Sequence, residues 1–226
     1  MSVKPILFNT AMVKAILDGR KTVTRRLGSW KIESYQEYTG DIEAKTVREV
    51  KQSRTTSHFY GCRRDFLEMH SQYQPGDILY VRETWHRYTK RIGKGEDCHL
   101  TEFYGYKASV KNSEDSNTPW KPSIHMPKEA ARIWLKVTNV QVERLQDMPH
   151  DAAGKEGIHY CECPDGFTWN PDTDMNCCYT TPSGAFRALW DSTVKKEDIN
   201  RYGWEANPWV FVIEFERCEK PQEDKK

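Results

Sequence analysis

The sequence predicts an α+β fold, a small mixed β-barrel with short helices at its ends and inserted arms. Three observations support this prediction. The clearest strand pattern spans residues 131–145, where apolar and polar side chains alternate. Amphipathic helical patterns occupy residues 10–18 and 183–194. The expected strands are short and do not alternate regularly with helices, which argues against a parallel doubly wound sheet.

Length and charge limit the classes of function. A chain of 226 residues is long enough for one domain with a sizeable core. The 34 Lys and Arg nearly balance the 33 Asp and Glu, so a nucleic-acid contact would have to come from a local basic cluster. There is no apolar run of transmembrane length and no pattern of a secretory leader. We therefore expect a cytoplasmic protein with no membrane partner.

The first expected helix covers residues 10–18. Asn9 or Thr10 can cap its start, apolar residues recur at helical spacing, and Gly19 ends it. The next residues, GRKTVTRR, are rich in β-branched side chains, which favours an extended conformation.

This basic stretch has two interpretations. Arg20, Lys21, Arg25 and Arg26 can form a loop that faces solvent or phosphate groups. Alternatively, the neighbouring positive charges lower the pKa of Lys21, which then acts as a general base on the hydroxyl of Thr24. Spacing alone favours the first interpretation.

Further elements follow along the chain. Residues 74–85 are typical of a turn and a strand, and residues 131–145 of a strand with a kink at a Thr-Asn pair. A short helix is expected over 146–158, with Pro149 in its first turn and Gly157 at its end. The apolar face of the helix over 183–194 consists of three residues, Phe186, Leu189 and Trp190.

The domain organisation follows from these patterns. Residues 207–218 are the last expected strand, so we predict a single domain over residues 1–218, and residues 219–226 are a charged tail. Three stretches that lack the core patterns are expected to be insertions: 28–74, 89–118 (with one strand pattern, TEFYGYKASV) and 159–181.

The third insertion is rich in cysteine. Its pattern is C-x-C followed by C-C, made of Cys161, Cys163, Cys177 and Cys178. Four thiolates can hold a structural zinc ion, although the usual spacing is C-x2-C, and reduced free thiols are the alternative. No H-E-x-x-H element is present, which disfavours a catalytic zinc.

Three single residues are also candidates for function. Glu156 is expected at the end of a short helix, where a carboxylate opposes the helix dipole slightly, so another role is plausible. Trp120 and Trp204 are expected in loops, where an aromatic ring can stack on a nucleic-acid base. Core packing remains the alternative for both tryptophans.

Four segments together resemble a known family. AILDGRKTVTRR, PGDILYVRETW, AAGKEGI and PWVFVIEFERC follow one another as in the ASCH domain, a PUA-like β-barrel. The signature G-x-K-x-x-x-x-R of that family corresponds here to Gly19, Lys21 and Arg26. The segment PWKPSIHMPKEAARIWLKVTNVQVERLQDM is similar to long ASCH-domain proteins encoded by bacteriophages and prophages. This resemblance implies the cytoplasm of a bacterium or of a phage-infected host cell.

The resemblance implies an activity. One bacterial branch of the ASCH family is an amidohydrolase that removes the acetyl group from N(4)-acetylcytidine, and its catalytic lysine, threonine and glutamate match Lys21, Thr24 and Glu156. By this resemblance Thr24 forms an acyl-enzyme and Lys21 is its base. Glu156 orients Lys21 or protonates the leaving amine, and Arg26 stabilises the oxyanion or the substrate. Catalysis then needs no cofactor, and zinc would be structural.

Two other functions remain open at this stage. The first is a non-catalytic protein that binds RNA or modified nucleic acid. Its contacts to phosphates would come from Arg20, Lys21, Arg25 and Arg26, and its contacts to bases from Trp120 or Trp204. The second is a phage accessory protein that binds a host protein through the inserted arms.

Overall fold

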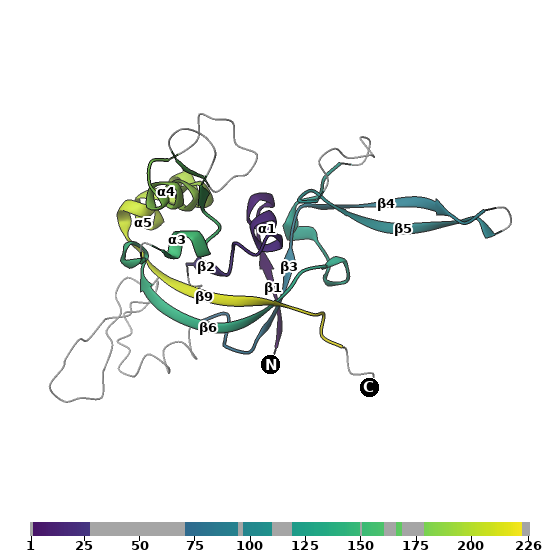
Figure 1. The fold of residues 1–226 in the computed structure, drawn as a ribbon, viewed down its shortest axis with the longest axis horizontal. Helices are drawn as coiled ribbons and strands as arrows, with labels where there is room; N and C mark the ends of the chain where they lie inside the picture. Colours follow the sequence, from purple (N-terminus) through teal and green to yellow (C-terminus); the bar gives the residue numbers. More distant parts are fainter. Residues whose placement is uncertain are drawn as a thin grey trace.

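The computed structural model describes residues 2–27, 71–94, 97–109, 119–149, 151–160, 166–168 and 179–222. Figure 1 shows a mixed sheet with helices at one end and a two-stranded arm that projects at the other. The predicted α+β class is confirmed. None of the helices in these ranges is long and apolar enough to cross a bilayer.

The central sheet has five strands in the order β1-β3-β6-β9-β2. Their bounds are Val3–Leu7 (β1), Val23–Arg26 (β2), Ile78–Arg82 (β3), Trp134–Arg144 (β6) and Trp209–Cys218 (β9). The β1–β3 pair is parallel and the other pairs are antiparallel. The register of β6 against β9 shifts between Val137 and Asn139, which confirms the predicted kink.

The described strands form an open sheet and not a closed barrel. The free edge of the sheet at β2 explains why. The backbone just before β2 pairs with a helix end instead of a strand: Thr22 N donates to Lys155 O at 2.9 Å, and Lys21 forms an isolated bridge with Glu156. Closure against β1 is therefore not seen in this part of the chain.

Two helices confirm the sequence patterns. Helix α1 spans Thr10–Leu17, and the Asn9 side chain caps it by accepting from Met12 N at 2.8 Å. Helix α4 spans Pro182–Thr193 and starts at Thr181, which accepts from Gly184 N at 3.1 Å. The predicted apolar face of α4 is buried.

The helix predicted over 146–158 is shorter than expected. A 3-10 turn, η4 (Leu145–Asp147), is followed by helix α3 (Ala152–Lys155). Met148 between them is extended, with ψ 126°, because a residue before proline is pushed out of the helical region. The helix therefore starts only after Pro149.

The segment after α4 forms a short helical cap. It contains η6 (Lys196–Asp198), α5 (Ile199–Tyr202) and η7 (Trp204–Ala206). The Trp190 indole N–H donates to Tyr202 O at 2.7 Å, which ties this cap to α4.

The arm consists of β4 (Trp85–Ile92) and β5 (His99–Tyr106), paired in antiparallel register. The strand expected within 89–118 is thus present, but its partner β4 starts before the predicted insertion and runs into it. Two 3-10 turns, η2 (Ser123–His125) and η3 (Lys128–Ala130), pack near the base of the arm. A second small ribbon joins β7 (His159–Tyr160) and β8 (Phe167–Thr168).

Candidate active site

The end of α1 delivers Lys21 to the protein interior. Gly19 adopts a φ of 74°, a left-handed value that glycine reaches without strain. The backbone then turns back on the helix, because the N–H groups of Arg20 and Lys21 both donate to Ala15 O, at 2.9 and 3.0 Å. As a result Lys21 is only 3% exposed.

The end of α3 brings Glu156 against Lys21. Glu156 is also 3% exposed, and its Oε2 lies 2.5 Å from Lys21 Nζ. Gly157 permits this approach: its φ is 100°, and an added Cβ would lie 3.0 Å from Ala15 Cβ and 3.6 Å from Lys21 Cβ. The structure therefore joins two of the three predicted catalytic residues in a buried ion pair.

The Lys21 ammonium group has three acceptors around it. Its Nζ donates to Glu156 Oε2, to Glu156 O at 3.0 Å and to Val23 O at 2.8 Å. An ammonium group has three protons to donate, so this geometry satisfies the charged form fully. Loss of one proton would leave Lys21 as a neutral amine with a free lone pair.

Burial has the largest effect on Lys21 and lowers its pKa below the usual value. The charge and the hydrogen bond of Glu156 oppose this shift, whereas the positive charges of Arg26 and Arg25 add to it. Lys21 therefore gives up its proton more readily than an exposed lysine, which is the property that a general base requires.

Thr24 lies beside this pair. It is 4% exposed, it belongs to β2, and it lines a cavity of about 520 Å³ together with Lys21 and Glu156. A volume of this size is typical of a small-molecule site. All three predicted catalytic residues thus share one cavity.

Arg25 is buried instead of exposed. It is 6% exposed, its Nη1 donates to Glu156 Oε1 at 3.0 Å, and its Nε donates to Glu143 Oε1 at 2.8 Å. Glu156 therefore has one carboxylate oxygen on Lys21 and the other on Arg25. In this arrangement Arg25 holds the carboxylate in place and does not reach the surface.

Arg26 lies at the mouth of the same cavity. Its Nη2 donates to Leu7 O at 2.6 Å, and its guanidinium lies over the Phe8 ring at 5.1 Å. Its Nε is buried and has no hydrogen-bond partner in the ranges that the structure describes. Arg26 thus adds a positive charge to the lining of the cavity.

The opposite wall of the cavity is apolar. Phe186, Leu189 and Trp190 of α4 line it, and Tyr202 of α5 lies at its edge. Two charged residues, Lys195 and Asp198, line the rim near this edge. The cavity thus has an ionic wall on β2 and an aromatic wall on α4.

Three predicted binding residues lie elsewhere. Arg20 donates to Gly157 O at 2.9 Å and pairs with Asp18, outside the cavity. The rings of Trp204 and Phe186 pack edge to face, with their centroids 6.0 Å apart, and Trp204 packs against the main core. Trp120 stacks on His86 at the base of the arm, with the two ring centroids 4.4 Å apart.

The predicted zinc ligands lie outside the described residues. Cys161, Cys163, Cys177 and Cys178 all fall in the gaps between the described ranges. Within those ranges, no group of three or more His, Cys, Asp or Glu residues is arranged to hold a metal ion.

Sequence reasoning missed two features of the site. The apolar face of α4 is detectable from its spacing, but spacing cannot tell a core face from a cavity wall. No sequence pattern indicated that Glu143 belongs to the site, because a single carboxylate at the end of a strand is usually exposed.

Comparison of the chain with known protein families, with curated proteins and with solved structures finds no match to any of them.

Proposed function

We propose that this protein is an amidohydrolase that acts on an acylated nucleoside such as N(4)-acetylcytidine. The observation that supports it best is the buried Lys21–Glu156 pair, with a 2.5 Å contact, next to a threonine in one cavity. The resemblance to the ASCH domain, a PUA-like fold, supports the same proposal, because Lys21, Thr24 and Glu156 match its amidohydrolase branch in residue type.

The first half of the reaction forms an acyl-enzyme. Neutral Lys21 takes the proton of the Thr24 hydroxyl as Oγ bonds to the acyl carbon, and the carbonyl electrons move onto oxygen. Arg26, whose guanidinium lines the cavity, stabilises this oxyanion. The C–N bond then breaks, and the leaving nitrogen takes the proton from the Lys21 ammonium.

The second half releases the acid. Water attacks the acyl carbon on Thr24 and gives a proton to Lys21. The bond between this carbon and Thr24 Oγ then breaks, and the Lys21 ammonium returns the proton to Oγ as the free acid leaves. Glu156 balances the charge of Lys21 in each protonated state. Arg25 holds the Glu156 carboxylate in place, because it donates a hydrogen bond to the second carboxylate oxygen.

The lining of the cavity suits an aromatic base. The rings of Phe8, Phe186 and Trp190 line it, and flat rings can stack on a heterocycle. The acyl group would then point to the β2 wall, where Thr24 lies.

The test uses purified protein and N(4)-acetylcytidine, with cytidine release followed by chromatography. We expect turnover that falls by at least about a thousandfold in Thr24→Ala and in Lys21→Ala. Thr22→Ala is the matched control, because Thr22 is an exposed threonine two residues away and should retain full activity. Mass spectrometry should detect one acyl group on Thr24 during turnover.

Two results would overturn the proposal. One is no release of cytidine by folded wild-type protein from this or related acylated nucleosides. The other is turnover that persists unchanged in Thr24→Ala.

A further inference from the structure

The arm formed by β4 and β5 is firmly anchored at its base. Trp85 is buried in a second apolar cluster, and the Tyr106 hydroxyl donates to Ala130 O at 2.7 Å. Arg132 lies over the Tyr106 ring at 4.1 Å and pairs with Glu83, which is 1% exposed. The arm is therefore held in a defined direction, and it projects on the side of the molecule opposite to α4 and α5 (Figure 1).

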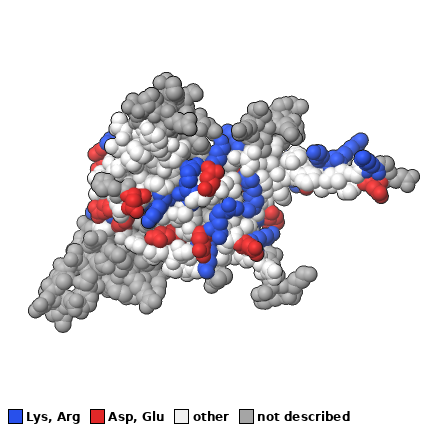
Figure 2. Space-filling model, in the orientation of Figure 1, with Lys and Arg blue, Asp and Glu red and all other residues white. Residues whose placement is uncertain are grey.

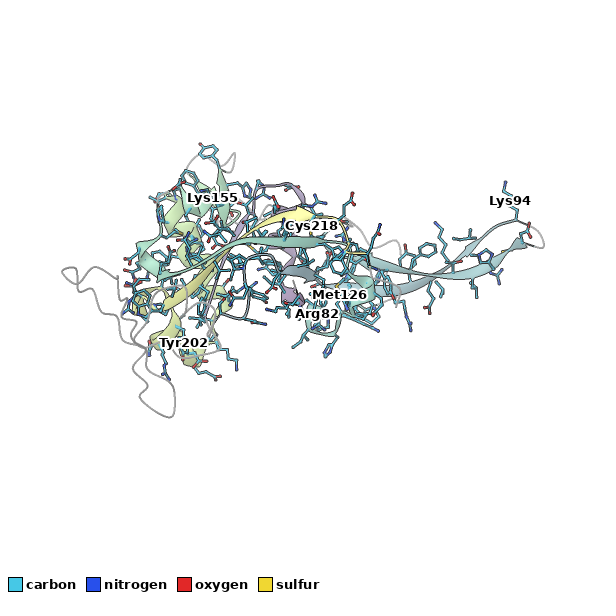
Figure 3. The ribbon with its side chains drawn as sticks, turned by 90° about the horizontal axis from the view of Figure 1, so that it is seen from below. Arg82, Lys94, Met126, Lys155, Tyr202 and Cys218 are labelled. Carbon is cyan, nitrogen blue, oxygen red and sulfur yellow. The ribbon has the colours of Figure 1, made fainter. Side chains whose placement is uncertain are left out.

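The outer part of the arm has no cover from the rest of the described chain. Every described residue in 89–94 and 97–100 is exposed. Lys94 lies near the far end, distant from Met126 at the base (Figure 3). Two strands without a covering layer are marginally stable in water, so an arm of this length gains stability if it binds something.

The arm has a local positive charge. Residues 85–107 contain five Lys and Arg against three Asp and Glu, so this segment alone has a larger net positive charge than the whole chain, which has +1. Four exposed cations lie on β4 and its turn: Arg87, Lys90, Arg91 and Lys94. Figure 2 shows lysine and arginine side chains along the arm. A polyanion matches this charge.

The cations lie on both faces of the ribbon. Side chains alternate along a strand, so Arg87 and Arg91 share one face and Lys90 lies on the other. Exposed apolar side chains accompany them near the tip: Leu100, 67% exposed, is the cross-strand partner of Arg91, and Ile92 is 41% exposed. One face of the ribbon therefore has Arg87, Arg91 and Leu100 together, and the other face has Lys90 and Ile92.

We propose that the β4–β5 arm binds duplex DNA by lying in its major groove. That groove admits a two-stranded β-ribbon. Strands of eight residues extend about 27 Å, slightly less than one turn of B-DNA. With the face of Arg87, Arg91 and Leu100 toward the groove floor, Leu100 reaches the base edges, where thymine methyl groups offer apolar contact, and the exposed lysines reach the phosphates.

The same geometry disfavours RNA. The major groove of an A-form duplex is deep and too narrow for side chains to enter. Duplex RNA of the same sequence should therefore bind more weakly than duplex DNA, and so should a single strand, which has no groove.

The test measures fluorescence anisotropy of a labelled 20-base-pair duplex with the full-length protein. The arm variant combines Lys90→Ala, Arg91→Ala and Lys94→Ala. The control variant combines Lys136→Ala, Lys155→Ala and Arg187→Ala, which removes the same charge from exposed sites elsewhere. We expect the arm variant to bind on the order of tenfold more weakly than the control. The slope of the logarithm of its binding constant against the logarithm of the salt concentration should become shallower by about two to three.

Three outcomes would overturn the proposal. They are no salt-dependent binding of duplex DNA by the wild type, equal losses in the arm and control variants, or duplex RNA or single strands bound as tightly as duplex DNA. Unchanged thermal unfolding of the arm variant shows that a loss of binding is not a loss of fold.

This inference does not rest on the proposed hydrolase. The arm variant leaves the cavity residues unchanged, so it should still release cytidine from N(4)-acetylcytidine at the wild-type rate. Conversely, Thr24→Ala should bind duplex DNA as the wild type does.

Discussion

The cavity and the arm use charged side chains in opposite ways. In the cavity, Lys21, Arg25 and Glu156 are each no more than 6% exposed and are paired within 3.0 Å. On the arm, Arg87 and Glu102 are more than half exposed and lie 3.3 Å apart. Water screens the arm charges and leaves them available to a partner, whereas burial makes each charge in the cavity depend on its neighbours.

The largest expected effect is on the cavity pair. Glu156→Gln removes the common partner of two buried cations, so we expect the free energy of unfolding to fall by about 3–5 kcal/mol. Urea unfolding followed by circular dichroism measures it. A loss below about 1 kcal/mol would show that the cluster is hydrated, like the arm.

The base of the arm should tolerate little added volume. In Gly105→Ala the new Cβ would lie 2.0 Å from His86 Nε2, so the His86–Trp120 stack must move. We expect a loss of about 1–3 kcal/mol. Gly154→Ala is the control, because nothing lies within 4 Å of that site in α3, and it should gain up to about 1 kcal/mol. Thermal unfolding of both variants measures the two changes in stability. Equal changes in the two variants would contradict the prediction.

A pH titration tests the electrostatics of the cavity. Burial is the main reason that the pKa of Lys21 is lowered, and Arg26 lowers it further, so Arg26→Gln should raise it. Since the neutral amine is the base, the pH at which kcat/KM rises should then move upward. NMR titration of the Lys21 side chain measures the same shift without substrate. A shift to lower pH would contradict this assignment.

The smallest effect is expected on the arm. Arg87→Ala breaks an exposed ion pair, and we expect it to change the free energy of unfolding by no more than about 0.5 kcal/mol. A chemical denaturation curve that overlays the wild type within error would agree. A loss above about 1 kcal/mol would mean that this pair is screened less than its exposure implies.

Much of the fold could be predicted because its signals are local. The helices at residues 10–17 and 182–193 and the kinked strand at 134–144 follow from spacing, caps and a Thr-Asn pair. Strand β1 was not predicted, because five residues with a proline in the middle carry too little pattern. The strand pairing of the arm was missed as well, since pairing across a turn depends on register and not on composition.

The candidate site was predictable only in part. Lys21 and Thr24 are three positions apart on one extended segment, so their proximity is local. Arg25 follows Thr24 directly and was expected to bind phosphate, yet it is buried on Glu156 and Glu143. No property of Arg25 itself distinguishes these outcomes, because they depend on which carboxylates the fold brings near.

The sequence by itself determined helices α1 and α4, the kinked strand β6, the turn at Gly19 and the candidate chemistry of Lys21 and Thr24, because each depends on neighbours along the chain. Only the tertiary structure decided that Glu156 meets Lys21, that the α4 face lines a cavity, and that the cations of β4 project on an anchored arm. These contacts join residues far apart in the chain. Their energies depend on burial and on distance in space, and spacing along the sequence records neither.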